Sequence, residues 1–303
     1  MTVLPAGTAA RASAPASSAN LGPGFDALAL ALDLIDVVTV TVTGRAGVTV
    51  DIAGEGRGQL PHDGGNLVAA TTIGCLADRG VAVSGLDIRC QNAIPQARGF
   101  GSSAAAIVAG VVVARALAGE PEDRAAALDS AASIEGHPDN VAACIYGGLT
   151  IAWTQDGRAR AARLEPSPDV GVWIFVPPGG VATSVARTAL PGQVPHRDAA
   201  HTAGRAALLV HALTVEPALL FAATDDRLHQ PYRAAAMPAG ADLIASLRAA
   251  GVPAVLSGAG PAVLAFDTPD RPLTSAVGRF APAGWIARGV GVHSVGVQVA
   301  RKN

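Results

Sequence analysis

The stretch that most restricts the fold is IPQARGFGSSAAAIVAG, residues 94–110. It ends a strand-like segment, passes through a turn containing Gly99 and Gly101, and continues into small residues at helical spacing. The pattern predicts a glycine turn directly before a helix N-terminus, where backbone amides lack partners and the helix dipole favours negative charge. Two interpretations remain open at this point: a tight turn before a serine-capped helix, or a site for an anion.

Charge and composition exclude several classes of protein. The 303 residues carry a formal net charge of −2, so no broad basic surface is available for nucleic acid or an anionic membrane. Lys302 is the only lysine, which argues against P-loop NTPases, protein kinases and pyridoxal-phosphate enzymes, because each needs an internal lysine. Three scattered cysteines, no signal peptide and no apolar run of about 18 residues predict a soluble, cytoplasmic protein.

The first half of the chain alternates predicted strands and helices. Residues 36–54 alternate Val or Ile with polar residues and predict a β-hairpin. Further elements are a helix over 64–80, a strand over 86–95, a helix from the glycine turn to Gly119, and a helix over 120–137. Residues 8–17, TAARASAPAS, are alanine-rich and only weakly strand-like. Either tertiary packing makes them a strand, or the N-terminus is loose.

The proline-containing stretch RLEPSPD, residues 163–169, indicates a domain boundary. We expect one domain over 1–165 and a second over 166–303. The second half contains predicted strands over 170–178 and 261–266, and predicted helices over 199–213 and 239–251. Strands and helices that alternate in clusters predict an α+β architecture in two halves.

Three other stretches combine a glycine turn with polar side chains: PASSANLGPGFDALALAL (15–32), EGHPDNVAACIYGGL (135–149) and LSGAGPAVLAF (256–266). Each of them alone is compatible with an ordinary turn. Taken in order with residues 94–110, they resemble the motifs of the GHMP kinase superfamily, which phosphorylates small molecules. SANLGPGFD most closely resembles the homoserine kinases of that superfamily. The resemblance spans roughly residues 12–266.

The resemblance implies a two-domain fold with ATP and substrate in the cleft between the domains. The N-terminal half would be similar to domain 2 of ribosomal protein S5, and the C-terminal half would be ferredoxin-like. Residues 95–105 would be the phosphate loop, with Phe100 on the side away from phosphate where the family usually has leucine. The implied ATP-binding residues are Pro95, Arg98, Gly99, Phe100, Gly101, Ser102, Ser103, Ala104 and Ala105, with Asn66 as a candidate for adenine.

The implied substrate pocket suits an amino acid that carries a hydroxyl group. In the family, the Asn and Asp of SANLGPGFD line this pocket, and here they are Asn20 and Asp26. Arg187, with Thr183 beside it, and Arg233 match the family's arginines. Two guanidinium groups suit one carboxylate, and Asp26 suits an ammonium group.

The EGHPDN stretch matches the residues nearest the transferring phosphoryl group. His137 would position the substrate, and Asn140 would hold its hydroxyl group. Asp139 would either accept the hydroxyl proton or only orient the substrate, and we favour contact over proton transfer because phosphoryl transfer is loose.

Magnesium would bind Ser103 and an acidic side chain. The resemblance leaves that side chain open between Asp129, eight residues before His137, and Glu135.

The resemblance implies ATP-dependent phosphorylation of the side-chain hydroxyl of L-homoserine to O-phospho-L-homoserine, a step of threonine biosynthesis. Two alternatives stay open: another amino acid or hydroxy acid such as L-threonine as acceptor, and a non-catalytic ligand sensor on the same scaffold. A Rossmann dehydrogenase is a poor alternative because GFGSSA lacks the G-x-G-x-x-G spacing. A homodimer is frequent in the family, and no feature of the sequence indicates one here.

Overall fold

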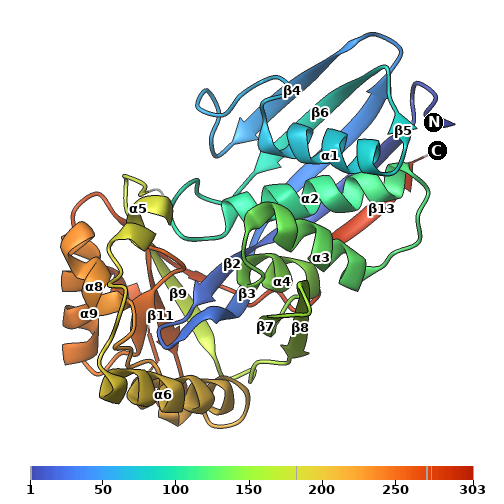
Figure 1. Cartoon of the computed structure of the whole chain (residues 1–303). Helices are drawn as coiled ribbons and strands as arrows, with labels where there is room; N and C mark the ends of the chain where they lie inside the picture. Colours follow the sequence, from blue (N-terminus) through green and yellow to red (C-terminus); the bar gives the residue numbers. More distant parts are fainter. Residues whose placement is uncertain (1, 182, 271, 274, 303) are drawn as a thin grey trace.

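The chain folds into two lobes that lie against each other (Figure 1). The computed structural model describes residues 2–181, 183–270, 272–273 and 275–302. The N-terminal lobe is built on the larger of the two main sheets, and the smaller of these two forms the C-terminal lobe with its helices. This arrangement of separate strands and helices confirms the predicted α+β class. Among the helices of the described residues, none is long and apolar enough to cross a membrane.

The described residues place seven strands in the larger sheet. In spatial order its main path is β13 (Gln298–Lys302), β2 (Ala9–Asn20), β3 (Gly24–Thr43), β6 (Gly85–Asn92) and β4 (Gly47–Gly54). The long strand β3 also pairs near Leu30 with β7 (Leu149–Gln155), which pairs with β8 (Arg158–Leu164). A small parallel pair, β1 (Thr2–Val3) with β5 (Val81–Ala82), lies outside this sheet.

The predicted hairpin over 36–54 is wrong in its pairing, although both strands exist. β6 lies between β3 and β4, antiparallel to β3 and parallel to β4. The parallel pair needs a crossover, and α1 (Leu67–Asp78) supplies it between β4 and β6. Alternating hydrophobicity therefore identified the two strands but carried no information about which strand would lie between them.

The alanine-rich segment near the N-terminus is a central strand and not a loose end. Its residues Ala12, Ala14 and Ala16 are fully buried, and β2 pairs with β3 on one side and β13 on the other. Pro15 is tolerated because the register between β2 and β3 shifts immediately after it. Small side chains here let a helix pack closely on the strand, so tertiary packing overrides the weak strand propensity.

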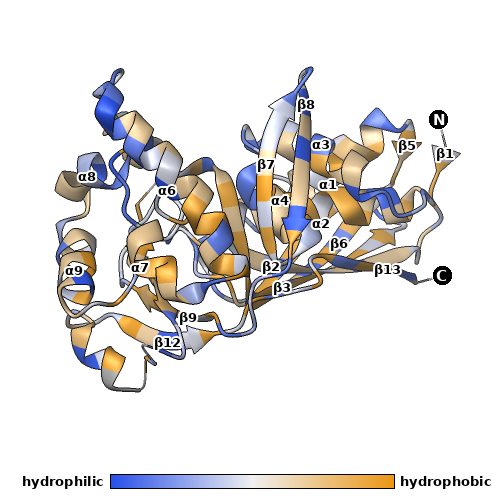
Figure 2. Ribbon diagram, turned by 90° about the horizontal axis from the view of Figure 1, so that it is seen from below, coloured by the Kyte–Doolittle hydropathy of each residue, from blue (hydrophilic) through white to orange (hydrophobic). Residues whose placement is uncertain are grey.

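Helices cover one side of the larger sheet. They are α1, α2 (Ser102–Leu117), α3 (Arg124–Glu135) and α4 (Asp139–Tyr146). The side chain of Asp123 accepts the N–H of Ala126 and caps α3, and Gly136 ends it with a φ of 90°. Figure 2 shows hydrophobic colour along β2, β3 and the helices that face them, with hydrophilic colour at outer turns. The buried side chains there form the main core.

The C-terminal lobe is an antiparallel sheet with helices packed against it. Its strands, in spatial order, are β10 (Ala254–Leu256), β11 (Val263–Asp267), β9 (Gly171–Val176) and β12 (Ile286–Val290). Its helices are α5 (Thr183–Thr188), α6 (His196–Thr214), α7 (Leu220–Ala223), α8 (Gln230–Arg233) and α9 (Pro238–Ala249), with short 3₁₀ turns η1 (Pro217–Leu219), η2 (Ala234–Ala236) and η3 (Ser275–Phe280). A second apolar cluster, including Phe175, Leu243 and Leu247, joins α9 to this sheet.

The last strand returns to the first lobe. β13 pairs with β2, so residues 298–302 belong spatially to the larger sheet although they lie at the end of the chain. Both termini consequently lie at the same end of the molecule (Figure 1). The expected division at residue 165 falls in the connection between β8 and β9, and it stays a prediction.

Candidate active site

A cavity of about 700 Å³ opens between the two lobes. Its N-terminal walls come from β3, β6, the start of α1, the loop before α2 and the end of α3. Gly180, Val181, Gly258 and Ala259 close it from the C-terminal lobe. A volume of this size is in the range of pockets for small molecules and nucleotides.

The glycine turn before α2 forms one wall of this cavity. Gly101 is the N-cap of α2 with a φ of 65°, and no side chain caps the helix there, so the first amides of α2 stay available. A Cβ at Gly101 would lie 2.2 Å from Ser17 Oγ and 3.0 Å from Asn140 Oδ1. Glycine is therefore required for its backbone conformation and for the close approach of two other motifs.

The same turn is held from the C-terminal lobe. Ser257 Oγ donates to the carbonyl oxygen of Gly99 at 2.8 Å, and the guanidinium of Arg98 donates to the carbonyl oxygens of Pro177 and Pro178. Arg98 is thus occupied by backbone contacts, although it lines the cavity. These bonds fix the position of the turn relative to both lobes.

The sequence-predicted ATP residues divide into two groups. Those that line the cavity are Asn66, Arg98, Gly99, Gly101, Ser102, Ser103 and Ala105. Pro95, Phe100 and Ala104 are buried and support the loop from behind. The side chain of Asn66 is already engaged as the N-cap of α1: it accepts from Val68 N–H and donates to the carbonyl oxygen of Pro61. One N–H of its amide remains for a ligand.

The SANLGPGFD stretch forms the tight connection between β2 and β3. Asn20 and Asp26 both adopt positive φ values, 68° and 53°, and Asn20 Oδ1 accepts the N–H of Asp26 at 2.9 Å. Asn20 Nδ2 donates to the carbonyl oxygen of Gly258 at 2.8 Å. Asn20 therefore shapes the turn and joins it to the C-terminal lobe, with its amide oxygen and nitrogen each engaged.

The structure brings Asp26 and Arg187 together across 161 residues of chain. Two guanidinium nitrogens of Arg187 each donate to a different carboxylate oxygen of Asp26, both at 3.1 Å. Both side chains are partly exposed, so they can exchange this pairing for a ligand that carries both charges. The side chain of Thr183 lies outside the described part of the chain, while its backbone begins α5.

Arg233 lies behind this ion pair and is almost completely buried. It donates to the carbonyl oxygen of Ala186 at 3.2 Å and to His229 Nδ1 at 3.1 Å. His229 donates its other ring nitrogen to the carbonyl oxygen of Gly22 at 2.8 Å and stacks on Phe25. Burial lowers the pKa of His229, which keeps the ring neutral and able to accept from Arg233.

The EGHPDN stretch places three polar side chains beside the glycine turn. His137 Nδ1 and Asp139 Oδ1 lie 2.5 Å apart, and this contact raises the pKa of His137. Asp139 Oδ1 also accepts the N–H of Asn140 at 2.7 Å and is buried at the start of α4. Ser17 Oγ donates to Asn140 Oδ1 at 2.8 Å, which leaves the amide N–H groups of Asn140 for the cavity.

The two candidate acidic residues for a metal lie in different surroundings. Ser103 Oγ donates to Glu135 Oε2 at 2.8 Å, and both residues line the cavity. Asp129 instead accepts the N–H of Ala159 in β8 at 3.1 Å, so the structure does not bring it to Ser103. Within the described residues there is no group of three or more His, Cys, Asp or Glu side chains that could hold a metal by themselves. Hydroxyl and carboxylate oxygens are nevertheless the ligands that Mg²⁺ prefers when phosphates complete its shell.

Comparison with known proteins identifies the family of the chain. Family models described as GHMP kinases N terminal domain and GHMP kinases C terminal match residues 66–148 and 209–279. Homoserine kinases of Streptomyces avermitilis and Streptomyces coelicolor are 51% and 52% identical, covering 96% of this chain and 95% and 94% of the relatives. The chain belongs to the homoserine kinase family of the GHMP kinases. The homoserine kinase structure from Cytophaga hutchinsonii matches with a TM-score of 0.84 at 27% identity, covering 96% of this chain and 97% of its own.

Two buried residues of this homoserine kinase family member were missed by the sequence reasoning. Asp36 lines the cavity from β3, and His229 orients Arg233. Asp36 sits within an alternating strand pattern, LIDVVTV, in which a single charged residue interrupts apolar ones. That interruption was the available signal for Asp36, whereas nothing local distinguished His229 from an exposed histidine.

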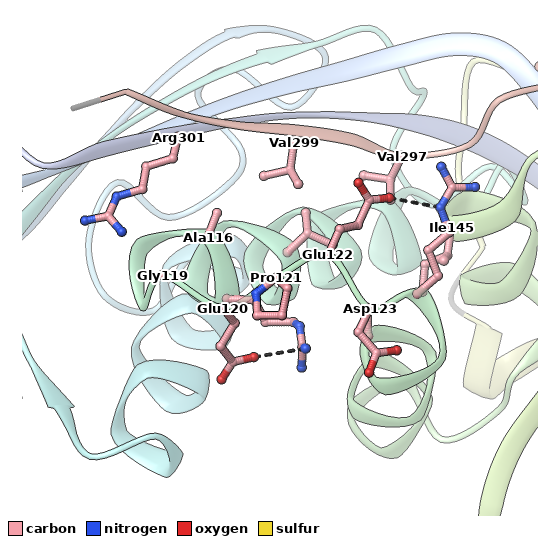
Figure 3. A pocket seen from close by; sticks show the side chains of 14 residues that line it. Ala116, Gly119, Glu120, Pro121, Glu122, Asp123, Ile145, Val297, Val299 and Arg301 are labelled. Atoms are coloured by element: carbon pink, nitrogen blue, oxygen red, sulfur yellow. Dashed lines mark hydrogen bonds and ion pairs between the residues drawn. The ribbon is translucent and has the colours of Figure 1, made fainter.

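A second cavity, of about 350 Å³, lies between the end of α2, the start of α3 and β13 (Figure 3). Its apolar walls include Val299, and its rim carries the ion pairs of Arg115 with Glu120 and of Arg124 with Glu122. None of the sequence-predicted site residues lines it.

Proposed function

We propose that this member of the homoserine kinase family transfers the γ-phosphoryl group of ATP to the side-chain hydroxyl of L-homoserine. The product is O-phospho-L-homoserine, a precursor of threonine. The observation that carries the proposal is the bidentate pair of Asp26 and Arg187 with Arg233 behind it. One acid and two cations match the ammonium and carboxylate of an amino acid. The ligand's ammonium group would pair with Asp26, and its carboxylate would pair with Arg187, so that the ligand takes over both sides of the ion pair.

The nucleotide phosphates would lie on the amides at the start of α2. Ser102 and Ser103 face the cavity there, and Gly101 leaves room for close approach. Ser103 and Glu135 are the pair that would hold Mg²⁺, in place of Ser103 and Asp129. When bound, the ion would neutralise charge on the phosphate oxygens.

His137 and Asn140 would position the hydroxyl of the substrate. Asp139 holds the His137 ring through Nδ1, which directs Nε2 of that ring away from Asp139. Asn140, held through its amide oxygen by Ser17, offers its N–H groups. Phosphoryl transfer through a loose transition state depends mainly on such positioning, so we assign Asp139 to orientation and not to obligatory proton removal.

We infer a cytoplasmic location from the proposed use of ATP, and three free, buried cysteines are compatible with a reducing compartment. A homodimer stays a prediction that sedimentation of the purified chain would decide.

The experiment is ADP release by the purified protein with ATP and magnesium, measured with L-homoserine, L-threonine, L-serine, mevalonate and galactose. We expect turnover with L-homoserine and little with the others. Faster turnover with L-threonine than with L-homoserine would identify L-threonine as the acceptor. Nucleotide binding without turnover on any acceptor would favour a ligand sensor and overturn the proposal.

Arg187→Gln supplies the matching test of the substrate pocket. Loss of the guanidinium should raise KM for L-homoserine by about 10- to 100-fold and leave KM for ATP within about threefold, since the side chain contacts Asp26 and not the phosphate turn. Equal increases in both KM values would contradict the assignment of Arg187 to the amino-acid pocket.

A further inference from the structure

A buried carboxylate reaches the cavity from the floor of the larger sheet. Asp36 is 5% exposed and lies on β3 just before the valines that pair with β6. It lines the cavity together with Val38, Val68 and Cys90, all buried and weakly polar or apolar. An ionised group in such surroundings is unfavourable unless it has hydrogen-bond partners.

Only one oxygen of Asp36 has partners among the described residues. Its Oδ1 accepts the N–H of Ala93 at 2.7 Å and the N–H of Ile94 at 2.9 Å. Its Oδ2 has no hydrogen bond to a described residue. Among the described residues, Thr71 Oγ1 is the single side-chain N or O atom that is both fully buried and without a partner, so the unpartnered Oδ2 of Asp36 is not fully buried. Oδ2 therefore keeps some accessible surface, and Asp36 is among the residues that line the cavity.

The backbone around Asp36 leads directly into the phosphate turn. Ala93 and Ile94 precede the loop that begins at residue 95, and the bonds to Oδ1 hold the start of that loop on β3. The same cavity is thus lined by the start of α2, whose first amides have no side-chain cap, and by an apolar group of side chains that includes the carboxylate of Asp36. The first suits the phosphates of a nucleotide and the second suits an aromatic base with an exocyclic amine.

Adenine presents an amino group at C6, which donates, whereas guanine and hypoxanthine present an acceptor oxygen there. An oxygen that can only accept would bind the first and repel the others. We propose that Asp36 Oδ2 accepts a hydrogen bond from the 6-amino group of the purine and so selects adenine nucleotides over 6-oxopurine nucleotides. The inference rests on the proposed nucleotide site but not on the identity of the phosphoryl acceptor.

Asp36→Asn is the decisive variant. The amide oxygen would keep the bonds to Ala93 and Ile94, because both partners donate, and the NH₂ group would turn to the cavity as a donor. Calorimetry on wild type and variant measures the dissociation constants for three nucleotides: ATP, inosine triphosphate and purine riboside 5′-triphosphate. The last of these lacks the 6-substituent. Asp242→Asn, an exposed change in α9 with the same loss of charge, is the control.

We expect Asp36→Asn to raise the dissociation constant for ATP by about 10- to 100-fold and to change that for purine riboside triphosphate by less than about threefold. The variant should bind inosine triphosphate more tightly than wild type does. Asp242→Asn should leave all three nucleotides unchanged. An equal loss for ATP and purine riboside triphosphate would overturn the proposal and make Asp36 a purely structural residue. Unchanged ATP binding would overturn it as well.

A measurement on wild type alone keeps the test valid if the variant does not fold. Burial raises the pKa of Asp36 to about 6, so its carboxylate is ionised at pH 7.5 and protonated at pH 5. The other titratable groups that face it are Glu55, Cys90 and Cys144, and burial raises the pKa of both thiols, which keeps them neutral at either pH.

The preference for ATP over purine riboside triphosphate should fall at least about fivefold between pH 7.5 and pH 5, since both nucleotides carry the same titrating phosphates. A constant ratio would overturn the proposal. Because binding is measured without an acceptor, a failure of homoserine turnover would leave these ratios intact, and the two failures are distinguishable.

Discussion

Asp36 shows how one buried acid links the cavity between the lobes to folding stability. Its carboxylate lies in an apolar part of the sheet, and burial outweighs the two backbone hydrogen bonds that lower its pKa. The pKa rises from an ordinary 3.8 to about 6. The folded chain therefore holds this proton more tightly than the unfolded chain does.

The sign of the resulting pH dependence follows from that difference. Stability from the protonated group is fully present below about pH 3.8 and is lost as pH rises through about 6. We expect the free energy of unfolding of wild type, relative to Asp36→Asn, to be about 2 kcal/mol lower at pH 7 than at pH 4.5. Urea unfolding of both proteins at both pH values measures this. A difference that does not change with pH would contradict it.

Gly101 combines a backbone requirement with a packing requirement, and the chain offers a control that separates them. Gly80 ends α1 with a φ of 64°, close to the 65° of Gly101, but a Cβ at Gly80 would meet nothing within 4 Å. Gly80→Ala should cost only the backbone strain of about 1 kcal/mol.

Gly101→Ala should cost more, since its Cβ would collide with Ser17 and displace Asn140. We expect at least about a 100-fold loss of kcat/KM in addition to the lower stability, because small displacements at a transfer site are costly. Kinetics and urea unfolding on both variants check this. Similar activity in the two variants would show that the close approach to Ser17 is not required.

At the scale of elements, β2 depends on small side chains. Ala10, Ala12 and Ala14 alternate along the strand and are buried in the main core, whose other side includes the alanines and valines of α2. The strand is stable because these alanines permit close packing, in spite of their low strand propensity.

Ala14→Leu should therefore destabilise the protein by about 1–3 kcal/mol through overpacking. Ala125→Leu, at an exposed position of α3, should change stability by less than about 0.5 kcal/mol and serves as the matched control. Chemical denaturation of the two variants measures both changes in stability. Equal stability would mean that β2 and α2 tolerate a larger separation than their buried alanines indicate.

At the scale of the whole molecule, the chain closes on itself. β13 covers one edge of β2, and the turn after β2 reaches the C-terminal lobe through Asn20 and the carbonyl oxygen of Gly258. One strand is thus held at its side by the end of the chain and at its tip by the other lobe.

Removal of residues 298–303 should lower the free energy of unfolding by several kcal/mol and promote aggregation, because it uncovers the edge of a central strand. Removal of residues 2–3, which form the exposed strand β1, should have a small effect. Thermal unfolding and light scattering measure both. Similar behaviour of the two truncations would show that β13 contributes little.

Much of the local structure was predictable because its signals act over a few residues. Periodicity identified the longer helices and several strands, Gly80 and Gly119 follow helices as glycine does elsewhere, and the glycine turn before α2 was expected at residues 99–101. The α+β class followed from the order of these elements.

The sequence by itself determined the longer helices, several strands and the glycine turn before α2, which forms one wall of the cavity. Tertiary structure alone decided that β6 separates β3 from β4, that Glu135 and not Asp129 contacts Ser103, and that β13 returns to β2. It also decided that Asp36 faces the cavity and that His229 holds Arg233. Backbone preferences depend on neighbours within about one turn, whereas strand partners and buried polar contacts depend on which distant segments bury the most apolar surface together.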